Sequence, residues 1–267
     1  MLKTTTKSKH GIIDHLGPKT TVIINGNENQ IELDFHWDVA VQERVTPALI
    51  DEWQHTLKLA ASYIPDGTKN HLSIGGGGDS QLGQLIPSTV QNWIVINPNI
   101  QELRAIHNPK KLKTILIRGI GEDIPLRNNT IDSIDILGTI DHVVSPNTVL
   151  SEAFRVAKTG ATLIITVTNS ESWYKKLFKV LKLAIPNKHS HAHEFTTEIL
   201  ESTLKQNGWI VKQIKTSYFL RLPVQIEKRF KSKQIRKFRN YVSNKLLPNV
   251  FGRDNGGIII CLAESNK

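Results

Sequence analysis

Short apolar runs alternate with helical patterns along the middle of the chain. The runs are rich in Ile, Val and Leu and lie at 71–74, 93–96, 115–117, 134–137 and 163–167. Helical spacing of apolar residues covers 100–106 and 148–157 between them. Strands buried on both faces of a sheet read as short β-branched runs, and alternating strands and helices are typical of a parallel sheet covered on both faces. The pattern therefore predicts an open, three-layer, doubly wound α/β fold.

The N-terminal part follows a different pattern. Residues 1–19 read as a loose leader, and strand-like runs at 21–24 and 31–35 flank the hairpin turn signal Asn25-Gly26-Asn27. A helix begins at Thr46-Pro47, with threonine as the N-cap and proline in the first turn. The sequence thus predicts a hairpin and helix extension before the sheet.

The C-terminal third is less regular. Its predicted elements are a helix at 173–185, a polar loop at 186–193, a helix capped by Thr196 or Thr197, a strand at 209–214, a basic amphipathic stretch at 224–247 and a strand at 258–262. We interpret 1–45 as an N-terminal leader and hairpin extension, and 46–267 as the main domain. In that domain, 170–195 and 220–250 are helical insertions or a cap.

Composition and charge add three limits. The chain has 267 residues, 39% of them apolar, and a net charge of +10, which favours anionic partners or reflects a basic solubility surface. Its single cysteine, Cys261, excludes an internal disulfide, and no Cys/His cluster has zinc-ligand spacing. The polar start lacks a signal-peptide core and no run is long enough to span a bilayer, so the cytoplasm is the simplest location.

A glycine-rich bend follows the first buried strand. The segment Ser73-Ile74-Gly75-Gly76-Gly77-Gly78-Asp79 holds four consecutive glycines, which let the backbone approach a ligand closely at a high cost in chain entropy. Ligands of open α/β sheets bind at the carboxyl ends of strands, and a helix start near Ser80 offers free amides. The dinucleotide pattern fails, because its third glycine falls on Ser80 or Gln81. The bend therefore predicts a ligand cradle, with a tight turn that binds nothing as the alternative.

Further motifs follow in order along the chain. They are the loop 119–126, the turn Asn129-Thr-Ile131-Asp132, the triplet Asp141-His142-Val143, the segment 153–160, and a late segment at 193–196 and 208–209. Together with Gly75 and Gly77 they resemble class I S-adenosylmethionine-dependent methyltransferases of the broad small-molecule type, over residues 69–217 and more weakly 256–264. The resemblance implies a seven-stranded sheet of order 3-2-1-4-5-7-6 with an antiparallel seventh strand, and S-adenosyl-L-methionine as cofactor.

The resemblance also implies roles for individual residues. Gly75 and Gly77 would face the methionine part of the cofactor, and Asn97 would hold the ribose. Gly121 and Glu122 would edge the adenine, and 138–141 would lie beneath the sulfonium and the acceptor. The full predicted cofactor set is Ser73, Gly75, Gly76, Gly77, Asp79, Asn97, Pro98, Gly121, Glu122, Gly138 and Asp141, and no metal is expected.

Three positions depart from the family pattern. Ser73 and Asn97 stand where family members usually carry acids, and Asp79 stands where another glycine is common. The sequence predicts methyl transfer to the oxygen or nitrogen of an unidentified small-molecule acceptor. A catalytically inactive, methyltransferase-like subunit that serves as a binding or scaffold protein is the first alternative, and an RNA methyltransferase is the second.

Histidines are the candidate bases. An oxygen acceptor of high pKa needs a base, whereas an amine must only be unprotonated. His142 and His193 are the predicted catalytic residues, and His191 and His36 are further candidates. Each of the four is alternatively a surface or packing residue. The segment 35–37 is a predicted part of an N-terminal lid.

The stretch 228–245 combines a run of Lys and Arg with apolar residues at helical spacing. One interpretation is a helix docked on the domain with a solvated basic face. The other is contact with RNA, an anionic membrane surface or a phosphorylated substrate. No RNA-binding module or aromatic stacking platform is recognisable in the sequence.

Overall fold

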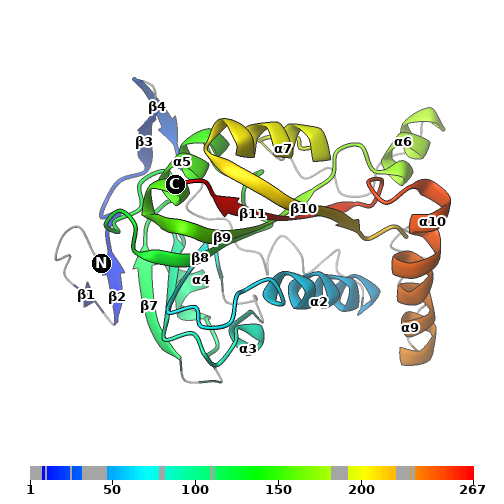
Figure 1. Ribbon diagram of the computed structural model, residues 1–267, viewed down its shortest axis with the longest axis horizontal. Helices are drawn as coiled ribbons and strands as arrows, with labels where there is room; N and C mark the ends of the chain where they lie inside the picture. Colours follow the sequence, from blue (N-terminus) through cyan, green and yellow to red (C-terminus); the bar gives the residue numbers. More distant parts are fainter. Residues whose placement is uncertain are drawn as a thin grey trace.

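A nine-stranded sheet forms the middle layer of the molecule (Figure 1). The computed structural model describes residues 8–9, 11–24, 26–31, 47–77, 82–108, 110, 112–181, 192–220, 229 and 232–267. The strands run in the order β1-β2-β7-β6-β5-β8-β9-β11-β10. They are β1 (Ser8–Lys9), β2 (Ile12–Asp14), β5 (Asn70–Ile74), β6 (Asn92–Asn97), β7 (Lys113–Arg118), β8 (Ile131–Leu137), β9 (Ala157–Thr168), β10 (Trp209–Ser217) and β11 (Ile258–Ser265).

The strand order confirms the predicted topology. From β7 to β10 the order is 3-2-1-4-5-7-6, and β11 lies antiparallel between β9 and β10. The predicted count of seven strands is wrong, because part of the presumed loose leader joins the sheet. Strand β2 pairs in parallel with β7, placing Ile12 opposite Leu116, and β1 pairs with β2. Both added strands are only two or three residues long, which is too short for an alternation of apolar and polar residues to predict them.

The N-terminal hairpin forms as predicted but with a shorter second strand. Strand β3 (Thr21–Ile24) pairs with β4 (Asn27–Gln30) rather than with 31–35. Gly26 has a φ of 80°, a value that favours glycine in a two-residue turn. The predicted strand residues 32–35 lie outside the described residues. The division of the chain at residue 45 stays a prediction.

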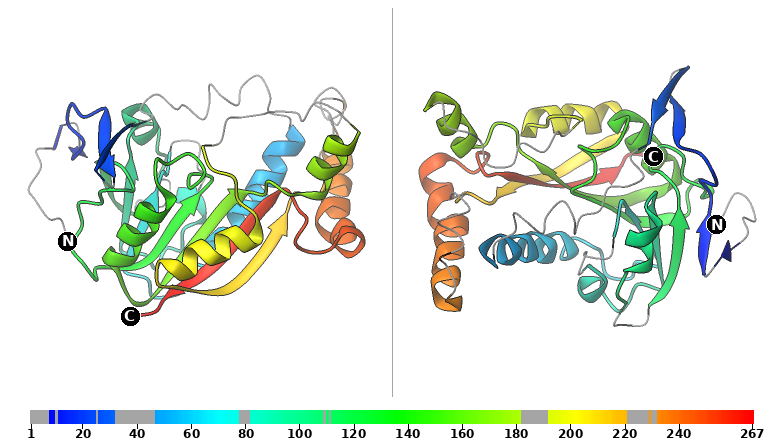
Figure 2. Two further views of the ribbon diagram at one scale, coloured as in Figure 1. Left: turned by 90° about the horizontal axis from the view of Figure 1, so that it is seen from above. Right: turned by 180° about the vertical axis from the view of Figure 1, so that it is seen from behind.

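Helices cover both faces of the sheet (Figures 1 and 2). One face carries α2 (Pro47–Ala61), α3 (Leu82–Leu85) and α4 (Ile100–Arg104). The other carries α5 (Pro146–Val156) and α7 (Thr197–Gln206). Ser145 caps α5 by accepting the Thr148 amide at 3.3 Å, and Thr196 caps α7 by accepting the Ile199 amide at 3.2 Å. Capping fixes where these helices begin, as the sequence indicates.

Four shorter elements gather at one end of the molecule (Figures 1 and 2). They are α6 (Trp173–Val180), α9 (Lys233–Tyr241), the π-helical turn η1 (Val242–Leu246) and α10 (Leu247–Phe251). The rings of Trp173 and Phe251 stack 4.1 Å apart and join the first of these elements to the last. No helix in the described ranges is long and apolar enough to cross a membrane.

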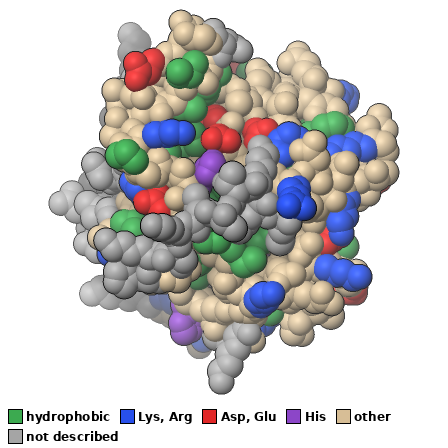
Figure 3. All heavy atoms as spheres, turned by 90° about the vertical axis from the view of Figure 1, so that its left-hand side faces the viewer, with side chains coloured by type: hydrophobic (Ala, Val, Ile, Leu, Met, Phe, Trp, Pro, Cys, Tyr) green, Lys and Arg blue, Asp and Glu red, His purple; other side chains and the backbone are tan. Residues whose placement is uncertain are grey.

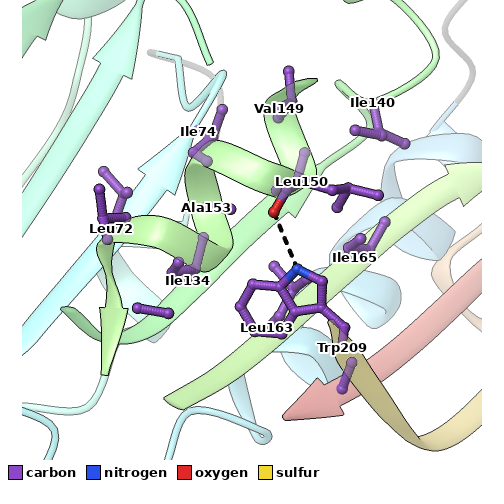
Figure 4. Packing of buried hydrophobic residues seen from close by; sticks show 14 of the residues in the cluster. Leu72, Ile74, Ile134, Ile140, Val149, Leu150, Ala153, Leu163, Ile165 and Trp209 are labelled. Atoms are coloured by element: carbon purple, nitrogen blue, oxygen red, sulfur yellow. Dashed lines mark hydrogen bonds between the residues drawn. The ribbon is translucent and has the colours of Figure 1, made fainter. Parts of the chain in front are cut away.

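The larger hydrophobic core lies between the sheet and the α5–α7 layer (Figure 4). Leu72 and Ile74 of β5 point to this face because they are two residues apart in a strand. They pack with Val149 and Leu150 of α5. The Trp209 indole N–H donates to the Leu150 carbonyl at 3.1 Å, which satisfies the one polar atom of that buried ring.

We expect Cys261 to be unreactive in the folded protein. Its side chain is fully buried in β11, and burial raises the pKa of its thiol to about 12. The unfolded chain loses this proton near pH 9.0. Cys261 therefore contributes stability below that pH that is lost as the pH rises towards 12. Labelling with a thiol reagent, with and without denaturant, checks the first point. The wild type should lose more stability than Cys261→Ala between pH 8 and pH 11. Rapid labelling of the native thiol would contradict the expectation.

Candidate functional site

The predicted glycine bend leaves the carboxyl end of β5, in the middle of the parallel strands. Strands β6 and β8 flank β5 on its two sides, so the chain order reverses at this strand. Such a point is where open α/β sheets bind ligands. The Gly75 amide donates to the Ile96 carbonyl of β6 at 2.8 Å, which fixes the start of the bend.

Two glycines of the bend lie close to other side chains, and at Gly75 the backbone itself requires glycine. Gly75 has a φ of 76°, and a Cβ there would collide with the Thr139 side chain behind β8. A Cβ on Gly77 would collide with the Glu102 carboxylate of α4. The bend therefore passes from the β8 side to the β6 side, with a hydroxyl group at one end and a carboxylate at the other.

Asn97 braces the bend from below. Its Nδ2 donates to the carbonyls of Gly76 at 3.0 Å and Gly75 at 3.4 Å, and its Oδ1 accepts the Asn99 amide at 2.8 Å. Pro98 lies within the turn that this last bond closes. The sequence predicted that Asn97 would hold a ribose, but the structure turns its amide group onto the protein backbone.

Glu102 is a site residue that the sequence reasoning missed. Its side chain is only 7% exposed and lies against Gly77. Asn99 caps α4 by accepting the amides of Gln101 at 2.8 Å and Glu102 at 3.3 Å. A Glu three residues after a capping Asn is the spacing of a capping box. The sequence pattern therefore indicates only helix capping and gives no sign that the Glu102 carboxylate approaches the glycine bend.

Ser73 does not face the site. It is fully buried on the α2–α3 side of the sheet, where its hydroxyl donates to Asp135 Oδ2 at 2.6 Å and accepts from the Trp93 indole at 2.9 Å. His71 Nε2 lies 2.7 Å from the same carboxylate oxygen, and His71 Nδ1 lies 2.6 Å from Ser133 Oγ. Ser73 thus belongs to a buried polar network across β5, β6 and β8, and its prediction as a cofactor residue is not supported.

The loop after β7 is joined to the loop after β8. Glu122 Oε1 accepts the amide protons of Val144 at 2.9 Å and Ser145 at 3.3 Å. Burial raises the pKa of Glu122, and the hydrogen bonds from these amides oppose the rise. A Cβ on the neighbouring Gly121 would come within 2.9 Å of Ile74. Both residues therefore fasten the loops and the core together, and a role at an adenine edge stays a prediction.

The loop after β8 brings the two predicted catalytic histidines into one region. His142 lies in the loop, and its amide donates to the Thr139 carbonyl at 2.9 Å. The His193 amide donates to the Asp141 carbonyl at 3.2 Å. His193 Nε2 lies 3.0 Å from the Val143 carbonyl, so this nitrogen carries the proton. Nδ1 of His193 is then the nitrogen that can accept one.

Trp53 of α2 is a second residue that the sequence reasoning missed. Gly138 has a φ of 62°, and a Cβ there would lie 3.5 Å from the Trp53 ring. Nothing in the sequence of α2 indicates an approach of Trp53 to the end of β8. The remaining predicted residues Asp79, His36 and His191, and the lid segment 35–37, lie outside the described residues.

The glycine bend and the nearby carboxylate are chemically suited to bind a ligand that contains a nucleoside. The glycine bend admits close approach of a ligand to the backbone, and Glu102 supplies a carboxylate that can accept hydrogen bonds from a sugar diol. Within the described part of the chain, no group of three or more His, Cys, Asp or Glu side chains could hold a metal ion. The roles of Gly75, Gly76, Gly77, Pro98, Gly138 and Asp141 towards a ligand remain predictions.

Part of the chain matches a family of known proteins. Residues 72–165, from β5 through β9, match the family model described as a methyltransferase domain. A search of curated proteins found no match.

Solved structures resemble the chain in fold. A Thermotoga maritima S-adenosylmethionine-dependent methyltransferase, described as a possible histamine N-methyltransferase, is 17% identical with a TM-score of 0.56, over 86% of this chain and 93% of that one. Haemonchus contortus phosphoethanolamine N-methyltransferase 2, in complex with S-adenosyl-L-methionine, is 15% identical with a TM-score of 0.53, over 80% and 53%. Streptomyces coelicolor geranyl diphosphate C-methyltransferase, in complex with S-adenosyl-L-homocysteine, is 10% identical with a TM-score of 0.53, over 80% and 76%.

Proposed function

We propose that the protein is an S-adenosylmethionine-dependent methyltransferase that methylates a nitrogen or oxygen atom of a small-molecule acceptor, because residues 72–165 match the family model described as a methyltransferase domain. The observation that carries the proposal is the glycine bend at a strand end suited to a ligand, where the backbone at Gly75 requires glycine and Gly77 lies against the Glu102 carboxylate. When bound, S-adenosyl-L-methionine supplies an electrophilic methyl group together with its leaving group. The protein has to align the acceptor and exclude water.

Two observations favour a small acceptor. Two similar structures are named for small amines, histamine and phosphoethanolamine. The chain also shows no recognisable RNA-binding module. Transfer to an amine needs only an unprotonated nitrogen, whereas transfer to a hydroxyl group needs a base.

Glu102 takes the role that the sequence assigned to Asn97. The Asn97 amide is engaged with Gly75, Gly76 and Asn99, so it braces the bend. The Glu102 carboxylate lies on the β6 side of the same bend, and a carboxylate accepts hydrogen bonds from hydroxyl groups. An acidic side chain thus lies beside the bend, but it comes from a residue five positions after Asn97 in the chain.

His193 is the residue best placed to receive a proton from an acceptor. Its Nε2 donates to the carbonyls of Val143 and Val144, which fixes the ring on the loop after β8 and reserves Nδ1 for the proton. For an amine acceptor, this nitrogen has only to take up the proton after transfer. His142 shares the loop and stays a second candidate.

Replacing Glu102 with glutamine is expected to weaken S-adenosyl-L-homocysteine binding about tenfold, because hydrogen bonds to charged groups contribute about 1.5–3 kcal/mol. Binding of a 2′,3′-dideoxy analogue should not change, since it lacks the hydroxyl groups. Calorimetry with both ligands measures the two affinities. Glu201→Gln, on α7 at the opposite face, is the matched control. Equal losses for the two ligands, or no loss for either, would contradict the assignment to Glu102.

Methyl transfer itself is tested with isotope-labelled cofactor and a pool of small metabolites. We expect label in the small-molecule fraction and none in RNA or protein. Label in RNA would overturn the choice of acceptor class. Absence of S-adenosyl-L-homocysteine binding by the wild type would instead indicate the inactive, scaffold-type protein.

A further inference from the structure

The large exposed hydrophobic side chains are concentrated in two segments. Of thirteen such side chains among the described residues, nine lie in 173–181 and 232–251, which we call the arm. They are Leu177, Val180, Leu181, Ile235, Phe238, Tyr241, Leu246, Val250 and Phe251. Val180, Phe238 and Val250 are 77%, 67% and 71% exposed. Scattered exposed apolar residues are ordinary, but a concentration of this kind marks an interaction site.

Helix α9 docks on the domain through its polar side. Arg239 forms a buried ion pair with Glu52 of α2, and Arg236 pairs with Asp51 at 2.8 Å. Ser243 of η1 also donates to Glu52, at 2.9 Å. The helix is therefore docked, as one of the two interpretations of the sequence has it, and several of its lysines are exposed. The contact with α2, however, is made by two arginines rather than by the apolar side.

The apolar side of α9 faces outward as a consequence. Ile235, Phe238 and Tyr241 are three residues apart, so they follow one side of the helix, and all are exposed. Leu177, Val180 and Leu181 have the same kind of spacing on α6. The stacking of Trp173 on Phe251 holds the two segments at the same end of the molecule (Figures 1 and 2).

The charge of the arm has one sign. Its two segments contain eight Lys and Arg and no Asp or Glu. Arg236 and Arg239 turn inward to α2, and the other six basic residues are lysines. The exposed lysines are Lys176, Lys179, Lys233, Lys237 and Lys245. At the opposite end of the molecule, by contrast, acidic and basic side chains are interspersed (Figure 3).

We propose that the arm docks on the surface of an anionic lipid bilayer. Aliphatic and aromatic side chains flanked by lysines match the two zones of a bilayer interface, where apolar groups enter the acyl boundary and ammonium groups meet the phosphates. RNA fits less well, because six of the nine exposed apolar side chains of the arm are aliphatic and have no ring on which a base could stack. This inference does not depend on the proposed methyl transfer.

Sedimentation of the full-length protein with vesicles tests the proposal. We expect binding to vesicles of equimolar phosphatidylcholine and phosphatidylglycerol at low salt, weaker binding at high salt, and none to pure phosphatidylcholine. The double variant Phe238→Ser, Val250→Ser should bind at least tenfold more weakly. Its control is Ile23→Ser, which removes an equally exposed side chain from the β3–β4 hairpin and should bind as the wild type.

A variant without two of the lysines tests the electrostatic part of the proposed membrane binding. Lys233→Gln with Lys237→Gln should weaken vesicle binding by about fivefold per lysine, since each lysine near an anionic surface contributes on that scale. Lys69→Gln with Lys113→Gln, at exposed positions of the main domain, should have no comparable effect. Thermal unfolding of each variant shows whether its fold is intact.

Three results would overturn the proposal. The first is no sedimentation of the wild type with anionic vesicles. The second is unchanged vesicle binding by the Phe238→Ser, Val250→Ser variant. The third is retention on single-stranded RNA, or self-association that this variant abolishes, in the absence of vesicle binding.

Discussion

Replacing Gly75 with alanine is expected to lower the affinity for S-adenosyl-L-homocysteine by about tenfold or more, which corresponds to about 1.4 kcal/mol or more. The backbone at Gly75 has a φ of 76°, which costs a residue with a Cβ about 1–2 kcal/mol. The new methyl group would also collide with the Thr139 side chain. Both effects push the bend away from β8 and break its fit to a ligand. Calorimetry measures the loss.

Gly67→Ala separates backbone strain from the collision. Gly67 has a φ of 80°, and a Cβ there would meet nothing within 4 Å. This variant should lose a little stability and bind the ligand as the wild type does. Thr139→Gly combined with Gly75→Ala should recover part of the affinity by removing the collision. Wild-type binding by Gly75→Ala would show that the ligand does not lie at this bend.

The sheet could be predicted because its strands carry their own signal. Buried runs such as 93–96 and 163–167 are apolar at every position except Thr166, and a continuous apolar run of this length is typical of a strand buried on both faces. Strand β2 carries no such signal, because three residues are too few for a period. Strand β2 forms because it pairs with β7 and because Ile12 and Leu16 become buried. These are tertiary contacts, which a local sequence pattern does not show.

The glycine bend of the candidate site could be predicted from the sequence, but the polar contacts around the bend could not. The glycines located the bend, since close approach requires glycine whatever the neighbours are. Which side chain approaches the bend depends on the geometry of α4, so the sequence did not single out Glu102. Ser73 shows the same limit, because the direction of its side chain follows from the strand register with Asp135.

The orientation of α9 was not readable for a similar reason. An apolar stripe predicts a docked apolar face when the helix meets a hydrophobic layer. Here the surface offered by α2 includes Asp51 and the fully buried Glu52. Arg236 and Arg239 of α9 form ion pairs with these carboxylates, and the apolar side of α9 is therefore exposed.

Removing the Asp135 carboxyl group by Asp135→Ala is expected to lower the free energy of unfolding by about 3–5 kcal/mol, the usual cost of breaking a buried polar pair. Its Oδ2 receives hydrogen bonds from Ser73 at 2.6 Å and His71 at 2.7 Å, and all three side chains are buried in the middle of the sheet. The alanine variant leaves the His71 and Ser73 donors without this acceptor. Urea unfolding followed by circular dichroism measures the loss.

A surface aspartate gives the matched control. Asp123 pairs with His15 at 3.1 Å, but its side chain is 50% exposed, so Asp123→Ala should cost less than about 1 kcal/mol. Asp135→Ala combined with His71→Ala should cost less than the sum of the single variants, because each removes the same hydrogen bond. Strict additivity would show that the two residues do not stabilise the fold as a pair. A cost for Asp135→Ala no larger than that for Asp123→Ala would show that the polar network on β5 and β8 contributes little to holding the bend above it.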